Sequence, residues 1–328
     1  MHETIAVVFD FDDTLAPDST SGYLREAGIV DLASFWKGEV ASLTDDDWDP
    51  VPAYLYKMIE ASKSSRIPLV TKSGLMDWGS RLPLHEGVPG IFSHLRSVAK
   101  EANPRASLEF YLISSGIGDI LRQTAIAKEF TDIWASEFAY GLDGGIDFPK
   151  KIVSFTDKTR YLFHIQKGLI GPQSRGKPFD VNKKLKAEQI RVPIRHMIFV
   201  GDGYTDIPCF SLVKKDGGVS IAVFDKNHEF NRGKNGLPVW TQFLTTQGRN
   251  GKSVRPRNNA ISVVVSANRR RGWRTMTSRK SMPITSAASN PLGLVASAKP
   301  SEAPAQLSQN NRSLCSRQAS KHRSDAVV

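Results

Sequence analysis

The chain has 328 residues, of which 40% are hydrophobic, and a formal net charge of +11. Its two cysteines and the lack of any apolar run near about 18 residues exclude a disulfide framework and a membrane-spanning helix. No secretory signal precedes the first predicted strand, so we expect a cytoplasmic protein without membrane contact. The charge is uneven, because 15 Lys and Arg stand against 2 Asp and Glu from Thr245 onward, whereas the preceding part is nearly neutral.

The first predicted strand runs from Thr4 to Asp10 and ends at two carboxylates. Asp12 follows Asp10 by two residues, and Thr14 supplies a hydroxyl two residues later. Because the backbone begins to turn at the carboxyl end of a strand, the two carboxylates can converge on one point. One can attack phosphorus as a nucleophile, and the other, if protonated, can give its proton to a departing alkoxide. The spacing therefore indicates phosphoryl transfer.

An Asp-x-Asp-x-Thr run also opens calcium-binding loops of the helix-loop-helix type. Such a loop beginning at Asp10 would need glycine where the chain has Leu15 and glutamate where it has Ser21. It would also follow a helix, whereas an apolar strand pattern precedes Asp10. These departures argue against a calcium loop.

Residues 16–90 separate this strand from the next motif and far exceed an ordinary loop of about 4 to 6 residues. A segment of this length carries structure of its own, and Pro52 marks the expected start of one of its helices. We predict a small helical domain whose large side chains form its own core rather than a surface that stacks on substrate. These side chains are Trp36, Trp48, Tyr54, Tyr56, Met58 and Trp78.

A second predicted strand, Leu108 to Ser114, ends in a hydroxyl and leads into Ser115 and Gly116. A hydroxyl here can hold a phosphate oxygen, although a serine after a strand is also an ordinary turn residue. Apolar residues at helical spacing predict a helix on either side of this strand. One helix is marked by Ile91, Phe92, Leu95 and Val98, and the other by Ile117, Ile120, Leu121 and Ala125.

A further strand is expected near Ile133 to Phe138, and the turn-rich stretch from Tyr140 to Pro149 predicts a hairpin or a loop. Lys158 then precedes a helical pattern that Gly168 ends. A lysine near a helix start adds a full charge to backbone donors that already suit an anion. Alone, such a lysine is as readily a solvated helix charge. The apolar residues that form the helical pattern after Lys158 are Tyr161, Leu162 and Ile165.

The predicted strand Met197 to Gly201 opens onto Asp202, and Asp206 follows four residues later. Glycines flank Asp202 and let the backbone approach a ligand closely, while the two carboxylates suit the oxygen-rich coordination of Mg²⁺. With a last strand from Val219 to Phe224, the strands are short, apolar and mostly separated by helical patterns. This order predicts an α/β fold with a Rossmann-like, doubly wound parallel sheet, whose ligands bind beyond the carboxyl ends of the strands.

The four motifs, in this order, resemble the haloacid dehalogenase (HAD) superfamily over about residues 5 to 225. The resemblance implies that Asp10 is a nucleophile that forms an aspartyl-phosphate. It implies that Asp12 is the general acid and then the base. The phosphoryl group would be bound or oriented by Thr14, Ser114, Ser115 and Lys158. Mg²⁺ would be held by Asp10, the backbone carbonyl of Asp12, Asp202 and Asp206.

The same resemblance implies a division of the chain. Residues 1–15 and 91–245 would form the catalytic core, and residues 16–90 a helical cap that closes over a small phosphorylated metabolite. Phosphoserine phosphatases are similar in layout and place an acid soon after the first motif to hold the substrate amine. The nearest candidate here is Asp18, in a Pro-Asp-Ser-Thr context that is equally a turn.

Within the superfamily, Asp12 favours a phosphatase or phosphomutase, because a dehalogenase has no alkoxide to protonate and family ATPases carry threonine at this place. We expect hydrolysis of a phosphomonoester. Two other functions stay open, a phosphotransferase or phosphomutase with the same residues and a non-catalytic protein that binds anions or nucleic acid through the basic tail. That tail, residues 246–328, has Trp273 as its one aromatic residue, and we expect it to be disordered. Its arginines could bind the phosphates of a nucleic acid, but no nucleic-acid-binding module is recognisable in the sequence. The substrate and the oligomeric state stay open.

Overall fold

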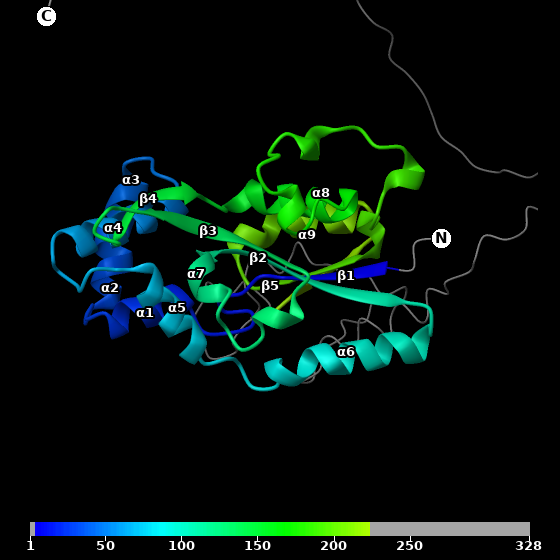
Figure 1. Ribbon diagram of the computed structural model, residues 1–328, viewed down its shortest axis with the longest axis horizontal. Helices are drawn as coiled ribbons and strands as arrows, with labels where there is room; N and C mark the ends of the chain where they lie inside the picture. The colour runs from blue at the N-terminus through cyan, green and yellow to red at the C-terminus, as the bar shows by residue number, and fades with distance from the viewer. Residues whose placement is uncertain (1–3, 224–328) are drawn as a thin grey trace, which may run out of the picture. The chain divides into compact units, whose positions relative to one another are not determined.

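A computed structural model describes residues 4–223 (Figure 1), and the expectations for Phe224 and for the basic tail lie outside this range. The strands are β1 (Thr4–Phe9), β2 (Ser107–Ile117), β3 (Asp132–Tyr140), β4 (Ile146–Lys151), β5 (Met197–Gly201) and β6 (Val219–Ala222). The α-helices are α1 (Ser19–Glu26), α2 (Leu32–Ser34), α3 (Ala41–Asp45), α4 (Pro50–Lys63), α5 (Lys72–Arg81), α6 (Val88–Ala102), α7 (Gly118–Leu121), α8 (Phe155–Lys167) and α9 (Ile207–Lys215). A π-helical turn spans Phe35–Val40, and 3₁₀ turns span Ala127–Glu129, Pro172–Ser174, Asp180–Asn182, Ala187–Gln189, Ile194–His196 and Tyr204–Asp206.

The strands form one sheet in the order β4-β3-β2-β1-β5-β6 (Figure 1). β1 pairs in parallel with β2 and β5, β2 with β3, and β5 with β6. The apolar sequence of β1 fits this central place, because both faces of such a strand are covered. Val7 and Phe9 face one side of the sheet, and Ala6 and Val8 face the other. The predicted Rossmann-like, doubly wound α/β fold is therefore confirmed.

Helices cover both faces of this sheet. α8 and α9 pack on the face of Ala6 and Val8, and α6 packs on the opposite face (Figure 1). Phe92 of α6 meets Phe110 of β2 edge to face, with ring centroids 5.0 Å apart. No helix within residues 4–223 is long and apolar enough to cross a membrane.

The stretch from Tyr140 to Pro149 is a hairpin, one of the two structures expected for it. β4 pairs antiparallel with β3 at the edge of the sheet, so the sheet is mixed rather than wholly parallel. The turn between the strands contains Gly144 at a φ of 79°, a conformation that glycine adopts without strain. The Asp143 carboxylate accepts a hydrogen bond from the Gly145 amide at 2.9 Å and stabilises the turn.

The helix predicted after β2 is much shorter than expected. α7 is a single turn, Gly118–Leu121. Ile117, which was assigned to the helix, ends β2 instead and is paired with β3. Ala125 is exposed beyond a turn in which the Thr124 hydroxyl donates to the Leu121 carbonyl at 2.8 Å. The helical assignment is wrong because the β2–β3 ladder extends into residues that suit either structure.

Helices α1 to α5 and the π-helical turn, from Ser19 to Arg81, are called the insertion below. Tyr54 and Met58, one turn apart on α4, are buried in a core shared with the α6 face of the sheet. Trp48 and Tyr56 were predicted to be buried, but they are 39% and 42% exposed and lie against each other with ring centroids 5.2 Å apart. Two residues along a helix correspond to about 200° around its axis, so Tyr56 faces away from the side that Tyr54 buries.

The helix start expected near Pro52 is present, and the two remaining tryptophans are partly buried against a core that the insertion shares with the sheet rather than a core of its own. Pro52 lies in the first turn of α4. Trp36 and Trp78 are partly buried against the shared core. Trp78 approaches α1 closely, since a Cβ on Gly22 would lie 2.5 Å from its ring.

Gly79 brings α5 of the insertion against α7. A Cβ at this position would lie 2.2 Å from the carbonyl oxygen of Ile120, so Gly79→Ala should lower the free energy of unfolding by about 1–3 kcal/mol. Gly90→Ala in α6 is the control, because nothing lies within 4 Å of the added methyl group. Its better helix propensity should raise the free energy of unfolding by up to about 1 kcal/mol. Urea denaturation measures the free energy of unfolding of both variants. Equal changes in the two would argue against a close contact between Gly79 and Ile120.

Candidate active site

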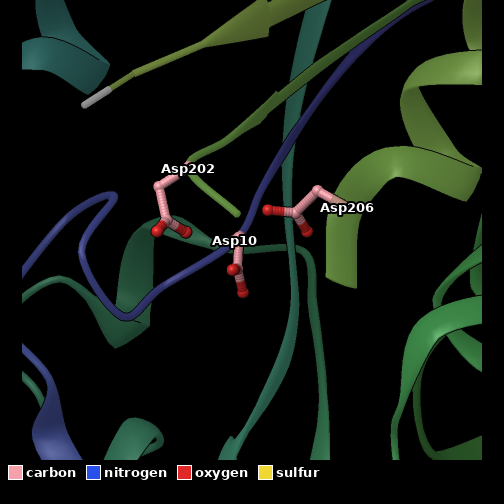
Figure 2. A group of neighbouring side chains, drawn as sticks. All are labelled: Asp10, Asp202 and Asp206. Carbon is pink, nitrogen blue, oxygen red and sulfur yellow. The ribbon is translucent and has the colours of Figure 1, made fainter. Parts of the chain in front are cut away.

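Three carboxylates converge at the carboxyl ends of two strands (Figure 2). Asp10 follows β1, Asp202 follows β5, and Asp206 precedes α9. One oxygen of each lies within 4.8 Å of the others. The cause is the sheet order, because β1 and β5 are parallel neighbours and the Asp10 amide donates to the Val200 carbonyl at 2.8 Å. The structure thus brings together three acids that the sequence places in two distant motifs.

Lys158 of α8 contacts the same group of carboxylates, and its side chain is fully buried. Its Nζ lies 3.1 Å from Asp10 Oδ1 and 2.7 Å from Asp206 Oδ1. It also donates to the Thr205 hydroxyl at 3.0 Å. Burial alone would lower the pKa of Lys158, but the charges of Asp10 and Asp206 outweigh it and raise that pKa. Lys158 is therefore a buried ammonium ion.

Asp206 is held by the protein through both of its oxygens. Oδ1 accepts from Lys158, and Oδ2 accepts from the Gly203 amide at 3.2 Å. Gly201 makes room for this carboxylate, since a Cβ there would lie 2.3 Å from Asp206 Oδ2. Asp202 is less buried, and its Oδ1 lies 3.4 Å from the Thr14 hydroxyl. Asp206 therefore positions Lys158, and Asp10 and Asp202 are better placed to bind a cation.

Burial and the neighbouring negative charges raise the pKa values of Asp10 and Asp202. Burial, followed by the charge of Asp206, raises the pKa of Asp10 to about 7. Burial, followed by the charges of Asp10 and Asp206, raises the pKa of Asp202 to about 9. A bound cation would offset this repulsion and favour the ionised carboxylates. A donor set made of carboxylate oxygens suits a small, hard divalent cation.

The side chain of Asp12 is not part of this group of carboxylates. Its Oδ1 accepts from the Ser19 amide at the start of α1, at 2.8 Å. Burial, followed by the charge of Asp18, raises the pKa of Asp12 to about 8. A carboxyl group with this pKa carries a proton near neutral pH, as a general acid must.

Ser114 and Ser115, the expected phosphate-binding residues, lie in the stretch of β2 between Ile113 and Ile117, where its pairing with β3 is irregular. Ser114 is buried, and its Oγ accepts from the Gly116 amide at 3.0 Å. A Cβ on Gly116 would lie 2.6 Å from Asp12 Oδ2, so glycine is needed where this stretch of β2 meets the acid. The Ser115 hydroxyl is buried without a hydrogen-bond partner among residues 4–223. The structure thus places Ser114 and Ser115 near Asp12, and Thr14 near Asp202.

Asp18, the candidate for holding a substrate amine, is the N-cap of α1. Its carboxylate accepts from the amides of Thr20 and Ser21, each at 3.0 Å, and from the Ser21 hydroxyl at 2.6 Å. These bonds use the carboxylate to satisfy the helix end. The turn interpretation of Asp18 is therefore the better one.

Three residues of the site were not predicted from the sequence. Thr205 lies between Asp202 and Asp206 of the fourth motif, so its position in that motif could have indicated a place in the site. Ser19 and Tyr54 come from the insertion. The Ser19 hydroxyl is buried without a hydrogen-bond partner in the described part of the chain, and the Tyr54 hydroxyl donates to the Ser115 carbonyl at 2.7 Å. No spacing in the sequence relates either residue to the carboxyl-terminal part of β2.

No protein-family model matches the chain. An uncharacterized protein of Borreliella burgdorferi is 27% identical over an alignment of 231 residues that covers 64% of this chain and 78% of that protein. Among solved structures, the chain is similar to a HAD family hydrolase of Salmonella enterica subsp. enterica serovar Typhi, with a TM-score of 0.46 and 15% identity over 67% of this chain. It spans only 62% of that Salmonella protein. It is also similar to a substrate-bound phosphoserine phosphatase, with a TM-score of 0.43 and 19% identity over 67% of this chain and 85% of that one.

The raised pKa values predict a pH-dependent response to a divalent cation, tested as Mg²⁺. The metal-free folded protein retains protons on Asp10 and Asp202 that the unfolded chain releases, so its stability falls as pH rises through about 4 to 9. Mg²⁺ should replace those protons, so the rise in Tm that it causes should be larger at about pH 9 than at about pH 6. Asp202→Asn should remove most of this rise, whereas Asp46→Asn, at an exposed position, should keep it. A rise independent of pH would refute this interpretation.

Proposed function

We propose that this chain is a Mg²⁺-dependent phosphatase of the HAD type that hydrolyses a small phosphorylated metabolite. The observation that supports the proposal most directly is the arrangement of Asp10, which is paired with a buried lysine, beside a second carboxylate. A separate acid with a raised pKa, Asp12, lies on the same loop. Nucleophile, charge neutralisation and proton donor are thus within one site.

Asp10 would act as the nucleophile. Its ion pair with Lys158 orients the carboxylate and favours its ionised form against burial. An oxygen of Asp10 forms a bond to phosphorus while the bond from phosphorus to the ester oxygen breaks. Lys158 would also neutralise charge on the phosphoryl group, and the Ser114 hydroxyl would donate to one of its oxygens.

Asp12 would move the protons. It gives its proton to the departing ester oxygen, so an alcohol leaves and Asp12 becomes a carboxylate. In the second step Asp12 accepts a proton from water, whose oxygen attacks phosphorus as the bond to Asp10 breaks. The products are inorganic phosphate, free Asp10 and protonated Asp12.

The carboxylates fit Mg²⁺, which prefers oxygen ligands and keeps several waters. Asp10 and Asp202 would hold it, together with the backbone carbonyl of Asp12 that the HAD resemblance implies, and Asp206 would support them through Lys158. When bound, the ion would neutralise negative charge on the phosphoryl group.

The insertion would serve as the cap of this site, in accord with its position between the first two motifs. One of its side chains contacts the core beside Asp12, since Tyr54 donates to the Ser115 carbonyl. Within the insertion, Trp78 donates to the Ser19 carbonyl at 3.0 Å and Trp36 donates to the Ser21 hydroxyl at 2.8 Å. These bonds hold α1, whose Ser19 amide donates to Asp12, against the rest of the insertion. A cover of this kind limits the site to small substrates and excludes bulk water.

Asp10→Asn tests the nucleophile. With para-nitrophenyl phosphate and Mg²⁺, this variant should lose at least about 1,000-fold in kcat, because the attacking group is removed while the fold is retained. Asp46→Asn, an exposed control, should keep the wild-type rate. Inorganic phosphate release, compared with transfer to added glycerol, separates hydrolysis from phosphotransfer. Near-normal turnover by Asp10→Asn would refute the mechanism.

Asp12→Asn should separate the two chemical steps. Nitrophenolate departs without a proton, so para-nitrophenyl phosphate can still phosphorylate Asp10, whereas the loss of the base slows the attack of water. We expect a burst of about one equivalent of nitrophenol per enzyme in rapid-quench measurements, followed by slow turnover. Loss of the burst together with the steady-state rate would show that Asp12 is needed for the first step even with this leaving group.

A further inference from the structure

A tyrosine of the insertion contacts the irregular stretch of β2 between Ile113 and Ile117. Tyr54 of α4 is 7% exposed, and its hydroxyl donates to the backbone carbonyl of Ser115 at 2.7 Å. The two residues are 61 positions apart in the chain. The proposed mechanism does not use Tyr54.

The carbonyl that Tyr54 contacts belongs to the peptide unit between Ser115 and Gly116. The N–H of the same unit is the Gly116 amide, which donates to Ser114 Oγ at 3.0 Å. Because a peptide unit is planar, its carbonyl and its N–H turn together. Tyr54 therefore fixes the orientation of the Gly116 amide, from which Ser114 Oγ accepts a hydrogen bond. Hydrogen bonds on both sides of one peptide unit also polarise each other.

This arrangement decides which way the Ser114 hydroxyl can donate. An oxygen that accepts from the Gly116 amide keeps its own O–H for another partner. The same stretch of β2 lies against Asp12, because a Cβ on Gly116 would lie 2.6 Å from Asp12 Oδ2. A change in the conformation of this stretch would thus affect both the expected phosphate-binding hydroxyl and the acid.

The Tyr54 side chain is itself held in place. Its ring lies 5.7 Å from the ring of Trp36, whose Nε1 donates to the Ser21 hydroxyl. Burial, followed by the charges of Asp12 and Asp18, raises the pKa of Tyr54, so the hydroxyl stays protonated and remains a donor.

We propose that Tyr54 is a positioning residue that, through the Ser115–Gly116 peptide unit, orients the Ser114 hydroxyl as a donor to the phosphoryl group. Phosphate binding then depends on the position of the insertion against β2 as well as on the residues of the core. The proposal rests on the proposed function for the role of Ser114.

Tyr54→Phe is the test, because it removes one hydroxyl and keeps the packed ring. Tyr56→Phe is the matched control, since it lies on the same helix, is 42% exposed and lies outside the site. With Mg²⁺ present, the inhibition constant of inorganic phosphate should rise about tenfold in Tyr54→Phe, and kcat/KM for para-nitrophenyl phosphate should fall by about the same factor. Tyr56→Phe should match wild type in both. The rise in Tm caused by Mg²⁺ alone should be the same in all three proteins.

A double-mutant cycle shows whether the effect passes through Ser114. Adding Tyr54→Phe to Ser114→Ala should change phosphate binding little, because the hydroxyl that Tyr54 orients is already absent. Additive effects would overturn the proposal. So would equal phosphate binding by Tyr54→Phe and Tyr56→Phe. A Tyr54→Phe protein that also loses its response to Mg²⁺ alone would have a general structural defect, and this too would overturn it.

Phosphate binding can also be followed as the rise in Tm on adding inorganic phosphate to the Mg²⁺-saturated protein, which needs no turnover. A wild-type protein that binds phosphate but hydrolyses no phosphate ester would refute the proposed function, while the comparison of the tyrosine variants would still test the inference.

Discussion

A lysine buried among carboxylates is the interaction on which the rest of the site depends. Transfer of an ammonium ion from water to a protein interior costs several kcal/mol, and this cost is offset only while Asp10 and Asp206 remain close to Lys158. The three residues come from the end of β1, the first turn of α8 and the turn before α9. The ion cluster therefore ties three segments together, and removing one partner leaves an uncompensated charge inside the protein.

The order of the strands determines what surrounds that cluster. β1 lies between β2 and β5, at the point where the chain changes direction across the sheet and where doubly wound folds bind ligands. The loops after β1 and β5, with α8, supply the charged side of the site. The carboxyl-terminal part of β2, with the insertion, supplies hydroxyls and Asp12's hydrogen-bond partner at Ser19. The charged side and the hydroxyl-bearing side of the site are thus contributed by different neighbours of one strand.

Much of this arrangement could be predicted, because each motif follows an apolar run whose place in a parallel sheet is strongly constrained. The carboxylate of Asp10 had to lie at a strand end, and Lys158 begins the stripe that α8 buries. Ile117 was misassigned because it suits a strand and a helix equally well. The exposure of Tyr56 depends on which side of α4 meets the core, and the Tyr54 contact joins segments far apart in the chain. Helical spacing on α4 places Tyr56 opposite Tyr54 and Met58, whereas the Tyr54 contact leaves no periodic signal in the sequence.

The central position of β1 has a consequence for synthesis on the ribosome. β1 is the first strand to emerge, yet one of its two neighbours, β5, comes at Met197–Gly201. Until that segment has been translated, the nascent chain holds Asp10 without Asp202 or Asp206. The growing polypeptide therefore cannot bring the three carboxylates together before residue 206 has been translated.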